Sequence, residues 1–498
     1  MWRAGPRLLR LSRMPEDRPS SPSAASAATW SSVAFGVRQG AQLLALMILA
    51  RLLAPEEFGV FAMAMVVTGL ALVLRDLGAG AAAIQDASPD QTLLSSLFWL
   101  AATSAAALAA IVVILAPAVA ELFAQPALAD VLPGLAIGLA VGGLGVVPQA
   151  LLERRLRFRA IAVAEALAGG VALVASVAAA ISGLGVGSLV VLSVVQVTVL
   201  TVTTMTIGGW LPRAAPSRAA LRRGGRYGLP VAGFSVLNYL ARNADNALIG
   251  RFLGATQLGY YAVAYRLMLL PVQVVNAVAN RVLFPILARL HDKPHARRSA
   301  YLSGVLFSSM VALPVAAGLA GAADIVIRVL YGPGWEPAVP VLRLLAIVAV
   351  AQVVGATVGP IFLATGRTDR LLLWGIVSSV VIVASFIVGL PFGITGVAAA
   401  YAVASAALFL PSLAVGLPLI GVRVADLLRR MAPEFVAAVA VGVLAWGLGT
   451  QLQGALGVVT LAVQVAICVP VYVGALWILD RPGIVGAASY LRRRGAPA

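Results

Sequence analysis

The 498-residue sequence contains few charged residues, one cysteine and two histidines. Charged side chains make up 11% of it, against about 25% in soluble domains, so a soluble globular fold is not expected. The single cysteine, Cys468, excludes an intramolecular disulfide and a cysteine-based metal cluster. His291 and His295 are four residues apart, but Pro294 lies between them. We therefore expect solvated loop residues here rather than a helical metal site.

The sequence also lacks the features of common enzymes. No loop is long enough to fold as a separate catalytic or nucleotide-binding domain. A Walker-type phosphate-binding loop is missing, and no Ser-His-Asp, HExxH or CxxC arrangement stands out. We therefore expect neither ATP hydrolysis by the chain itself nor any enzymatic activity, and no cofactor is implied.

Long apolar stretches dominate what is present. Hydrophobic residues make up 61% of the chain, and the mean hydropathy is +0.98. About fourteen stretches are long enough to cross a hydrocarbon layer of ~30 Å as helices. We therefore predict an all-α polytopic membrane protein with spans at 30–53, 59–77, 93–116, 130–151, 160–181, 187–208, 228–250, 258–284, 301–321, 338–363, 371–389, 395–418, 434–450 and 457–479.

The basic residues alternate between loops. Of the 36 lysines and arginines, 29 fall in the tails and loops of one side, and four fall on the other: Arg51, Arg251, Arg328 and Arg343. By the positive-inside rule the Arg-rich side is cytoplasmic, and so are both termini. The same distribution accounts for the net charge of +17, which then indicates anionic membrane lipids and not nucleic acid as partners.

Two segments of the chain resemble each other at a shift of 200 positions. Residues 51–64 (RLLAPEEFGVFAMA) and 251–264 (RFLGATQLGYYAVA) share an Arg, a Leu, a Gly and two Ala at equivalent places. Six spans separate the copies, so both point the same way and predict a parallel repeat. A turn signal common to both segments is the alternative explanation.

The repeat predicts two six-helix lobes, followed by two extra helices. The expected organisation is a disordered basic tail (1–29), the N-lobe (30–208), a basic linker (209–227), the C-lobe (228–418), a cytoplasmic loop (419–433), helices 13 and 14 (434–479) and a second basic tail (480–498). Two-lobed membrane proteins commonly place a substrate path between the lobes.

Polar side chains inside three spans are the candidate site. Such groups are costly in lipid and usually face a cavity. Helical spacing places each set on one face: a pair on the first helix, a stripe on the seventh and a heptad series on the eighth. The candidate cavity residues are Arg38, Gln42, Asn238, Arg242, Asp245, Asn246, Arg266, Gln273 and Asn280.

These stripes would give a cavity with three guanidinium groups and one carboxylate. Guanidinium suits bidentate binding of phosphate oxygens, so the interpretation favours an anionic substrate headgroup. A structural interpretation is the alternative: Arg242 and Asp245 would neutralise each other at i,i+3, while Arg38 and Arg266 would snorkel or bind helix ends.

Four stretches of the chain resemble Wzx-type polysaccharide flippases. They are residues 50–85 (ARLLAPEEFGVFAMAMVVTGLALVLRDLGAGAAAIQ), 153–159 (ERRLRFR), 243–251 (NADNALIGR) and 259–266 (GYYAVAYR). The similarity extends over nearly the whole chain from about residue 30 and places it in the multidrug/oligosaccharidyl-lipid/polysaccharide (MOP) exporter superfamily, in the branch of lipopolysaccharide and exopolysaccharide biosynthesis transporters.

The resemblance implies a mechanism. Members have 12–14 helices in two lobes that form a V-shaped central cavity. They work by alternating access and flip polyprenyl-pyrophosphate-linked oligosaccharides to the outer leaflet of the inner membrane. In related lipid II flippases the cavity is cationic and lined by the first, second, seventh and eighth helices. Tyr261 and Tyr265 would lie near the sugar. Polysaccharide polymerase and export machinery are implied as partners.

Ion coupling is implied as well. Some relatives couple transport to a Na⁺ or H⁺ gradient, and Asp245 is the candidate switch because its pairing with Arg242 would alternate with cation binding. The chain has only one lysine and few intramembrane acidic residues, so the resemblance does not identify the ion. Alternatives are a lipid II flippase, a drug/cation antiporter and a polysaccharide polymerase or ligase. The last typically needs a larger outer loop than this chain has.

Overall fold

The computed structural model describes residues 36, 39–75, 78–86, 89–279, 283–290, 292–451 and 457–480, and all regular structure in these ranges is helical. Eleven helical stretches are long and apolar enough to cross a membrane, and one of them, Thr368–Ile420, contains two long helices. A shorter apolar helix covers Gln39–Leu49. With the long helix α8, each of the predicted spans falls on a helix, so the chain is an all-α multi-span membrane protein.

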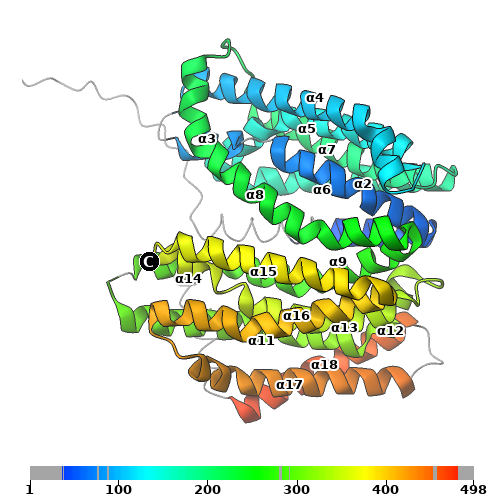
Figure 1. Cartoon of the computed structure of the whole chain (residues 1–498), viewed down its shortest axis with the longest axis vertical. Coiled ribbons are helices and arrows are strands. Elements are labelled where there is room, and N and C mark those ends of the chain that lie inside the picture. Colours follow the sequence, from blue (N-terminus) through cyan, green and yellow to red (C-terminus); the bar gives the residue numbers. More distant parts are fainter. Residues whose placement is uncertain are drawn as a thin grey trace, which may run out of the picture.

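The N-lobe helices form the upper half of Figure 1. α4 packs along α5, α5 along α7, and α7 along α6. Glycines in α5 permit this close packing: Gly143 faces Ala105 of α4, and Gly138 faces Val194 of α7. Beyond Gln39–Leu49, the helices are α2 (Pro55–Arg75), α3 (Ala79–Gln85), α4 (Gln91–Leu122), α5 (Leu128–Arg154), α6 (Phe158–Ile181) and α7 (Gly187–Gly208).

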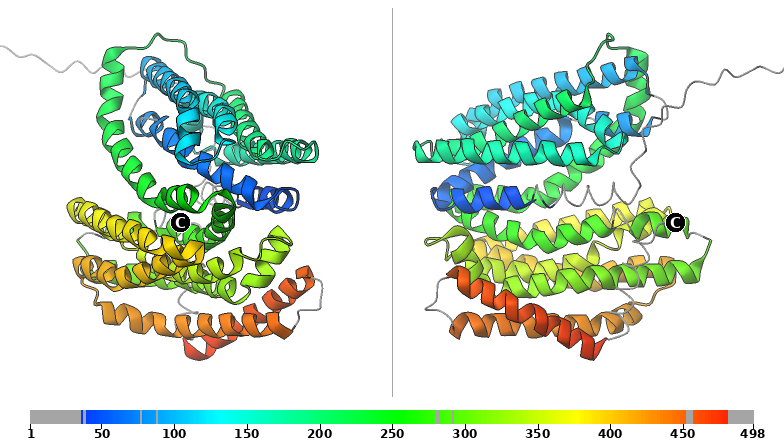
Figure 2. Two further views of the ribbon diagram at one scale, coloured as in Figure 1. Left: turned by 45° about the vertical axis from the view of Figure 1, so that its right-hand side comes forward. Right: turned by 180° about the vertical axis from the view of Figure 1, so that it is seen from behind.

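Apart from α8, the C-lobe helices form the lower half of Figure 1, with α17 and α18 along its bottom edge (Figures 1 and 2). α13 packs against α9, α11 and α16, while α17 packs against α11 and α18. The helices are α8 (Arg218–Leu253), α9 (Ala255–Val278), α10 (Phe284–Arg289), α11 (Pro294–Gly321), α12 (Ala323–Tyr331), α13 (Ala338–Gly355), α14 (Gly359–Ala364), α15 (Thr368–Gly389), α16 (Gly393–Gly416), α17 (Val424–Gln451) and α18 (Gly457–Leu479).

α8 and α9 connect the two lobes. α8 runs from the top of the molecule down to the middle, touching α2, α3 and α4 of the N-lobe and α15 and α16 of the C-lobe (Figure 1). Gly254, with φ of +86°, is the only residue between α8 and α9, and this conformation favours glycine. α9 then packs against both α2 and α13. Most of the residues expected to line a central path, Arg38, Gln42 and Asn280 excepted, are therefore on the two helices that touch both lobes.

Several boundaries differ from the sequence-based expectation. α8 begins at Arg218 and α17 at Val424, so helix replaces part of the predicted 209–227 linker and of the predicted 419–433 loop. Both extensions are rich in charged residues. A prediction based on apolar stretches leaves such residues out of the predicted spans. Pro294 starts α11, where a first-turn residue needs no N–H partner, so His295 lies in the first turn of this helix and not in the predicted loop. The tails at 1–29 and 481–498, and His291, lie outside the described residues.

Candidate functional site

A cavity of about 500 Å³ lies between the lobes. Its walls come from the Gln39–Leu49 helix, α2, α6 and α7 on one side and from α8 and α9 on the other. The apolar part includes Leu46, Phe61 and Leu269. The polar lining, which belongs to both lobes, consists of Gln39, Gln42, Ser193, Gln196, Asn243, Asn246, Tyr265, Arg266 and Gln273.

This inter-lobe cavity carries a net positive charge. Arg266 supplies a guanidinium group, and none of the described residues lining the cavity is acidic. The Gln39 side-chain amide donates a hydrogen bond to the Gln273 side-chain oxygen, across the boundary between lobes. Asn246 keeps a buried side-chain oxygen without a partner. The cavity therefore offers one cation together with amide donors and acceptors.

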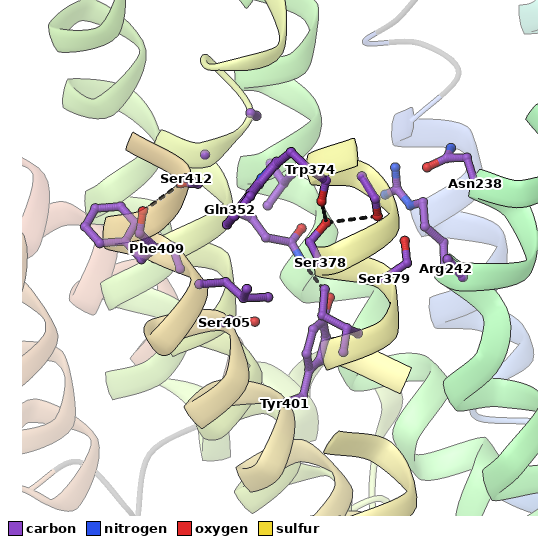
Figure 3. A pocket seen from close by; sticks show the side chains of 18 of the residues that line it. Asn238, Arg242, Gln352, Trp374, Ser378, Ser379, Tyr401, Ser405, Phe409 and Ser412 are labelled. Atoms are coloured by element: carbon purple, nitrogen blue, oxygen red, sulfur yellow. Dashed lines mark hydrogen bonds between the residues drawn. The ribbon is translucent and has the colours of Figure 1, made fainter. Parts of the chain in front are cut away.

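A second cavity, of about 370 Å³, lies within the C-lobe. Figure 3 shows Asn238 and Arg242 entering it from α8. Opposite them stand hydroxyl groups of α15 and α16, with a side-chain amide from α13. These polar residues are Gln352, Ser378, Ser379, Tyr401, Ser405 and Ser412, and Asn276 of α9 also lines the cavity.

Tyr265 forms part of the wall between the two cavities, because it lines both of them. Its hydroxyl interacts electrostatically with that of Tyr401. Tyr401 in turn accepts a hydrogen bond of 2.6 Å from the Gln352 amide nitrogen. Residues of α9, α16 and α13 therefore act together in this wall.

Asp245 lines neither cavity and is only 1% exposed. Its carboxylate accepts a hydrogen bond of 2.9 Å from the Tyr261 hydroxyl and one of 2.8 Å from the Asn246 backbone N–H. In the described part of the chain no ion pair joins it to Arg242, although the two charges influence each other. Tyr261 is completely buried and donates to Asp245, so the expected contact between Tyr261 and a sugar is not available in this state.

The structure divides the predicted polar residues into groups. Gln42, Asn246, Arg266 and Gln273 meet in the inter-lobe cavity. Asn238 and Arg242 face the C-lobe cavity instead, because α8 presents different sides to the N-lobe and to α15. Arg38 and Asn280 lie outside the described residues. Within the described part of the chain, no group of three or more histidine, cysteine or acidic side chains suits a metal ion.

Sequence reasoning missed several lining residues. Gln39 and Asn243 interrupt the apolar faces of their helices and in fact line the inter-lobe cavity. Gln196 and Gln352 are isolated amides within predicted spans, which was a usable signal. The C-lobe serines gave no signal, since small residues are frequent in membrane helices for packing reasons.

We call the end of the molecule that carries Arg51, Arg251, Arg328 and Arg343 the Arg-poor end, because 29 basic residues are assigned to the other side. Close contacts join the lobes at this end. The Trp335 indole N–H donates to the Ala50 carbonyl at 3.1 Å, and the Arg51 guanidinium donates to the Val329 carbonyl at 2.8 Å. The Trp335 ring packs edge-on against Phe58 at 5.1 Å. Since Phe58 also lines the inter-lobe cavity, this cluster covers it on that side.

The sequence matches the model of a family described as "Polysaccharide biosynthesis protein" over residues 48–340. Among similar proteins is the lipopolysaccharide biosynthesis protein WzxC of Escherichia coli (strain K12), 26% identical over 73% of this chain and 74% of that protein. The succinoglycan biosynthesis transport protein ExoT of Rhizobium meliloti (strain 1021) is 27% identical over 70% and 71%. The teichuronic acid biosynthesis protein TuaB of Bacillus subtilis (strain 168) is 26% identical over 70% and 73%.

Solved structures give the same fold. The lipid II flippase MurJ in an inward closed conformation superimposes with a TM-score of 0.74 over 92% of this chain and 100% of that one, at 16% identity. An inward-facing MATE multidrug transporter of the MOP superfamily gives 0.61 over 80% and 99%, at 15% identity. At such identities the likeness concerns fold alone. Because the family model covers more than half of the sequence, the chain belongs to the polysaccharide biosynthesis protein family, and within it to the Wzx-type membrane transporters and not to the enzymes.

Proposed function

We propose that the protein flips a polyprenyl-pyrophosphate-linked oligosaccharide from the cytoplasmic to the outer leaflet of the inner membrane. The observation that carries the proposal is the inter-lobe cavity, which combines Arg266 with amide side chains from both lobes and has no acidic residue among its described lining. The names of the similar proteins, which concern lipopolysaccharide, succinoglycan and teichuronic acid biosynthesis, support a glycan substrate.

The lining matches the two chemical parts of such a headgroup. Arg266 donates hydrogen bonds to pyrophosphate oxygens, which it can do in a bidentate manner. Gln42, Asn246 and Gln273 exchange hydrogen bonds with sugar hydroxyls, and the free Asn246 oxygen is an acceptor ready for one. The polyprenyl tail stays in the bilayer, because its burial in a polar cavity would lose the favourable apolar environment.

Alternating access follows from where the lobes touch. In our proposal the Arg-poor end faces outward, as the positive-inside rule predicts, and both termini are cytoplasmic. The Trp335 cluster then closes the outer side of the cavity while substrate enters from the cytoplasm. Breaking these contacts and rocking the lobes, predicted to be related by the parallel repeat, would expose the headgroup to the outer leaflet.

Arg242 and Asp245 have different roles in this scheme. Arg242 adds positive charge to the C-lobe cavity, beyond Tyr265, where hydroxyl groups from α15 and α16 could receive part of a longer sugar chain. Asp245 remains the candidate for Na⁺ or H⁺ coupling, because it is buried on α8 between Arg242 and Asn246, each of which lines one of the cavities. A polysaccharide polymerase and export machinery would take the product onward.

The test is translocation of a fluorescent polyprenyl-pyrophosphate oligosaccharide in proteoliposomes, measured by its accessibility to an impermeant quencher. We expect transport by the native chain, loss of at least tenfold in Arg266→Ala and partial recovery in Arg266→Lys. Arg251→Ala, which removes an arginine at the Arg-poor end outside the cavity, is the matched control. Equal rates in Arg266→Ala and native protein would remove the cavity assignment, and transport of a cationic drug alone would favour an antiporter.

A further inference from the structure

A pocket of about 270 Å³ lies at the Arg-poor end of the C-lobe, among α11, α12, α13, α17 and α18. It shares no lining residue with the inter-lobe cavity or the C-lobe cavity, so the proposed transport path does not use it. Its polar lining comprises Asp324, Arg328, Arg343, Thr450 and Gln464. We call it the α12 pocket.

The α12 pocket concentrates positive charge where the chain otherwise has little. Arg328 and Arg343 are two of the four arginines assigned to this end of the molecule. Arg343 forms an ion pair with Asp324, while Arg328 has no ion-pair partner among the described residues. Two guanidinium groups and one carboxylate leave a net charge of +1, which matches a phosphate group carrying a single negative charge.

Gln464 adds a buried acceptor to the same pocket. The side chain is 2% exposed, and its amide nitrogen donates a hydrogen bond of 2.8 Å to the Ala445 carbonyl. Its side-chain oxygen has no partner. A buried acceptor without a donor is unfavourable, so a ligand that brings a hydroxyl group to this oxygen would be stabilised.

An apolar groove of about 510 Å³ continues from the α12 pocket toward the opposite end of the C-lobe. Gly321, Arg343 and Trp446 line both spaces, so the groove and the pocket are contiguous. The groove runs between α11 and α13 on one side and α17 on the other, where Val439 and Val443 are 47% and 61% exposed. Its exposed apolar wall lies on helices that span the membrane, so acyl chains are its natural contents.

We propose that the α12 pocket and its groove bind one phospholipid of the outer leaflet, with phosphatidylglycerol as the best-matched chemistry. Arg328 and Arg343 donate to the phosphodiester oxygens, and a glycerol hydroxyl donates to the free Gln464 oxygen. One acyl chain lies in the groove against Val439 and Ile347. The single negative charge of a phosphodiester balances the net charge of +1 in the pocket, whereas the negative charge of a pyrophosphate would exceed it. The bound lipid fixes α17 and α18 to the rest of the C-lobe.

Native mass spectrometry of the full chain, released from detergent and titrated with phosphatidylglycerol, tests this proposal. We expect one lipid of higher affinity than the rest, and about tenfold weaker binding of it in Arg328→Gln, since one charge-assisted interaction is lost. Arg251→Gln is the matched control, because this arginine lies at the same end but outside the pocket. Phosphatidylcholine of the same acyl chains, which has no headgroup donor, should bind more weakly.

A second pair of variants tests the groove. Val439→Trp fills it and should weaken binding, while Val436→Trp, on the same helix and also exposed but outside the lining, should not. Equal affinity in native protein and Arg328→Gln, or equal affinity for phosphatidylcholine, would overturn the proposal. Displacement of the bound lipid by micromolar undecaprenyl pyrophosphate would also overturn it, and would assign the site to the transported lipid.

Discussion

Gly59 and Gly259 lie at equivalent places on the two sides of one helix crossing. A Cβ atom on Gly59 would stand 1.7 Å from the Ala255 carbonyl oxygen, and one on Gly259 would stand 1.9 Å from the Pro55 carbonyl oxygen. Each contact is the other shifted by 200 residues, and α2 and α9 begin at those same two positions, Pro55 and Ala255. This reciprocity supports the predicted 200-residue repeat at these helices, and it makes two glycines necessary for the lobes to meet.

Replacing either glycine should open the Arg-poor end. In Gly59→Ala or Gly259→Ala the added methyl group overlaps backbone atoms, which cannot rotate away, at a cost of about 1–3 kcal/mol to the crossed arrangement. We expect a cysteine at Ala62, a cavity-lining position, to react faster with an impermeant maleimide added from outside. The chain suits this measurement because Cys468→Ser removes its only cysteine.

Gly170→Ala provides the control for the glycine variants, since a Cβ there has nothing within 4 Å. It should leave the labelling of position 62 unchanged. Unchanged labelling in Gly59→Ala as well, with transport intact, would show that the crossing of α2 and α9 does not need to be this close.

Trp335→Phe should weaken the same closure through a different contact. The variant keeps an aromatic ring against Phe58 but leaves the Ala50 carbonyl without its donor, which costs about 1–3 kcal/mol in a buried position. We expect the outward-open population to rise by roughly tenfold or more, again read from labelling at position 62. Trp99→Phe, on a 43% exposed tryptophan, serves as control, and an effect of equal size there would refute a specific role for Trp335.

Asp245→Asn should uncouple transport from its driving gradient if Asp245 is the ion switch. The amide keeps the shape of the side chain and an oxygen for the Tyr261 hydroxyl, but it can carry neither a proton nor the charge that binds Na⁺. Flipping measured with and without imposed Na⁺ and pH gradients should become gradient-independent. Asp324→Asn, outside the transport path, should retain the native response. A native response in Asp245→Asn would exclude the residue as the switch.

The Tyr261–Asp245 hydrogen bond should also stabilise the C-lobe. Tyr261→Phe leaves a fully buried carboxylate oxygen without its donor, so we expect a loss of about 1–3 kcal/mol in the free energy of unfolding. Thermal unfolding in detergent measures it as a lower Tm. In the double variant with Asp245→Asn the loss should be smaller than the sum of the single losses, because the two groups form one interaction. Additive losses would show that they act independently.

Local properties explain how much could be predicted from the sequence. Membrane spans are runs of apolar residues whose helical hydrogen bonds are satisfied within each segment, so hydropathy located all the long apolar helices of the described chain. The 200-residue likeness also indicated which helices correspond. The helical starts of α8 and α17 were missed because their charged residues lie beyond the apolar windows.

The sequence alone determined that this is a polytopic membrane protein with a strong charge asymmetry, a resemblance to Wzx-type transporters and polar residues concentrated on three helices. Only the tertiary structure decided which of those residues share a cavity. Arg242, Asp245 and Asn246 lie within five positions of each other. Arg242 faces the C-lobe cavity, Asp245 is buried, and Asn246 faces the inter-lobe cavity. Helical spacing places residues on a face, but the neighbouring helices determine whether that face meets a partner, lipid or an open cavity.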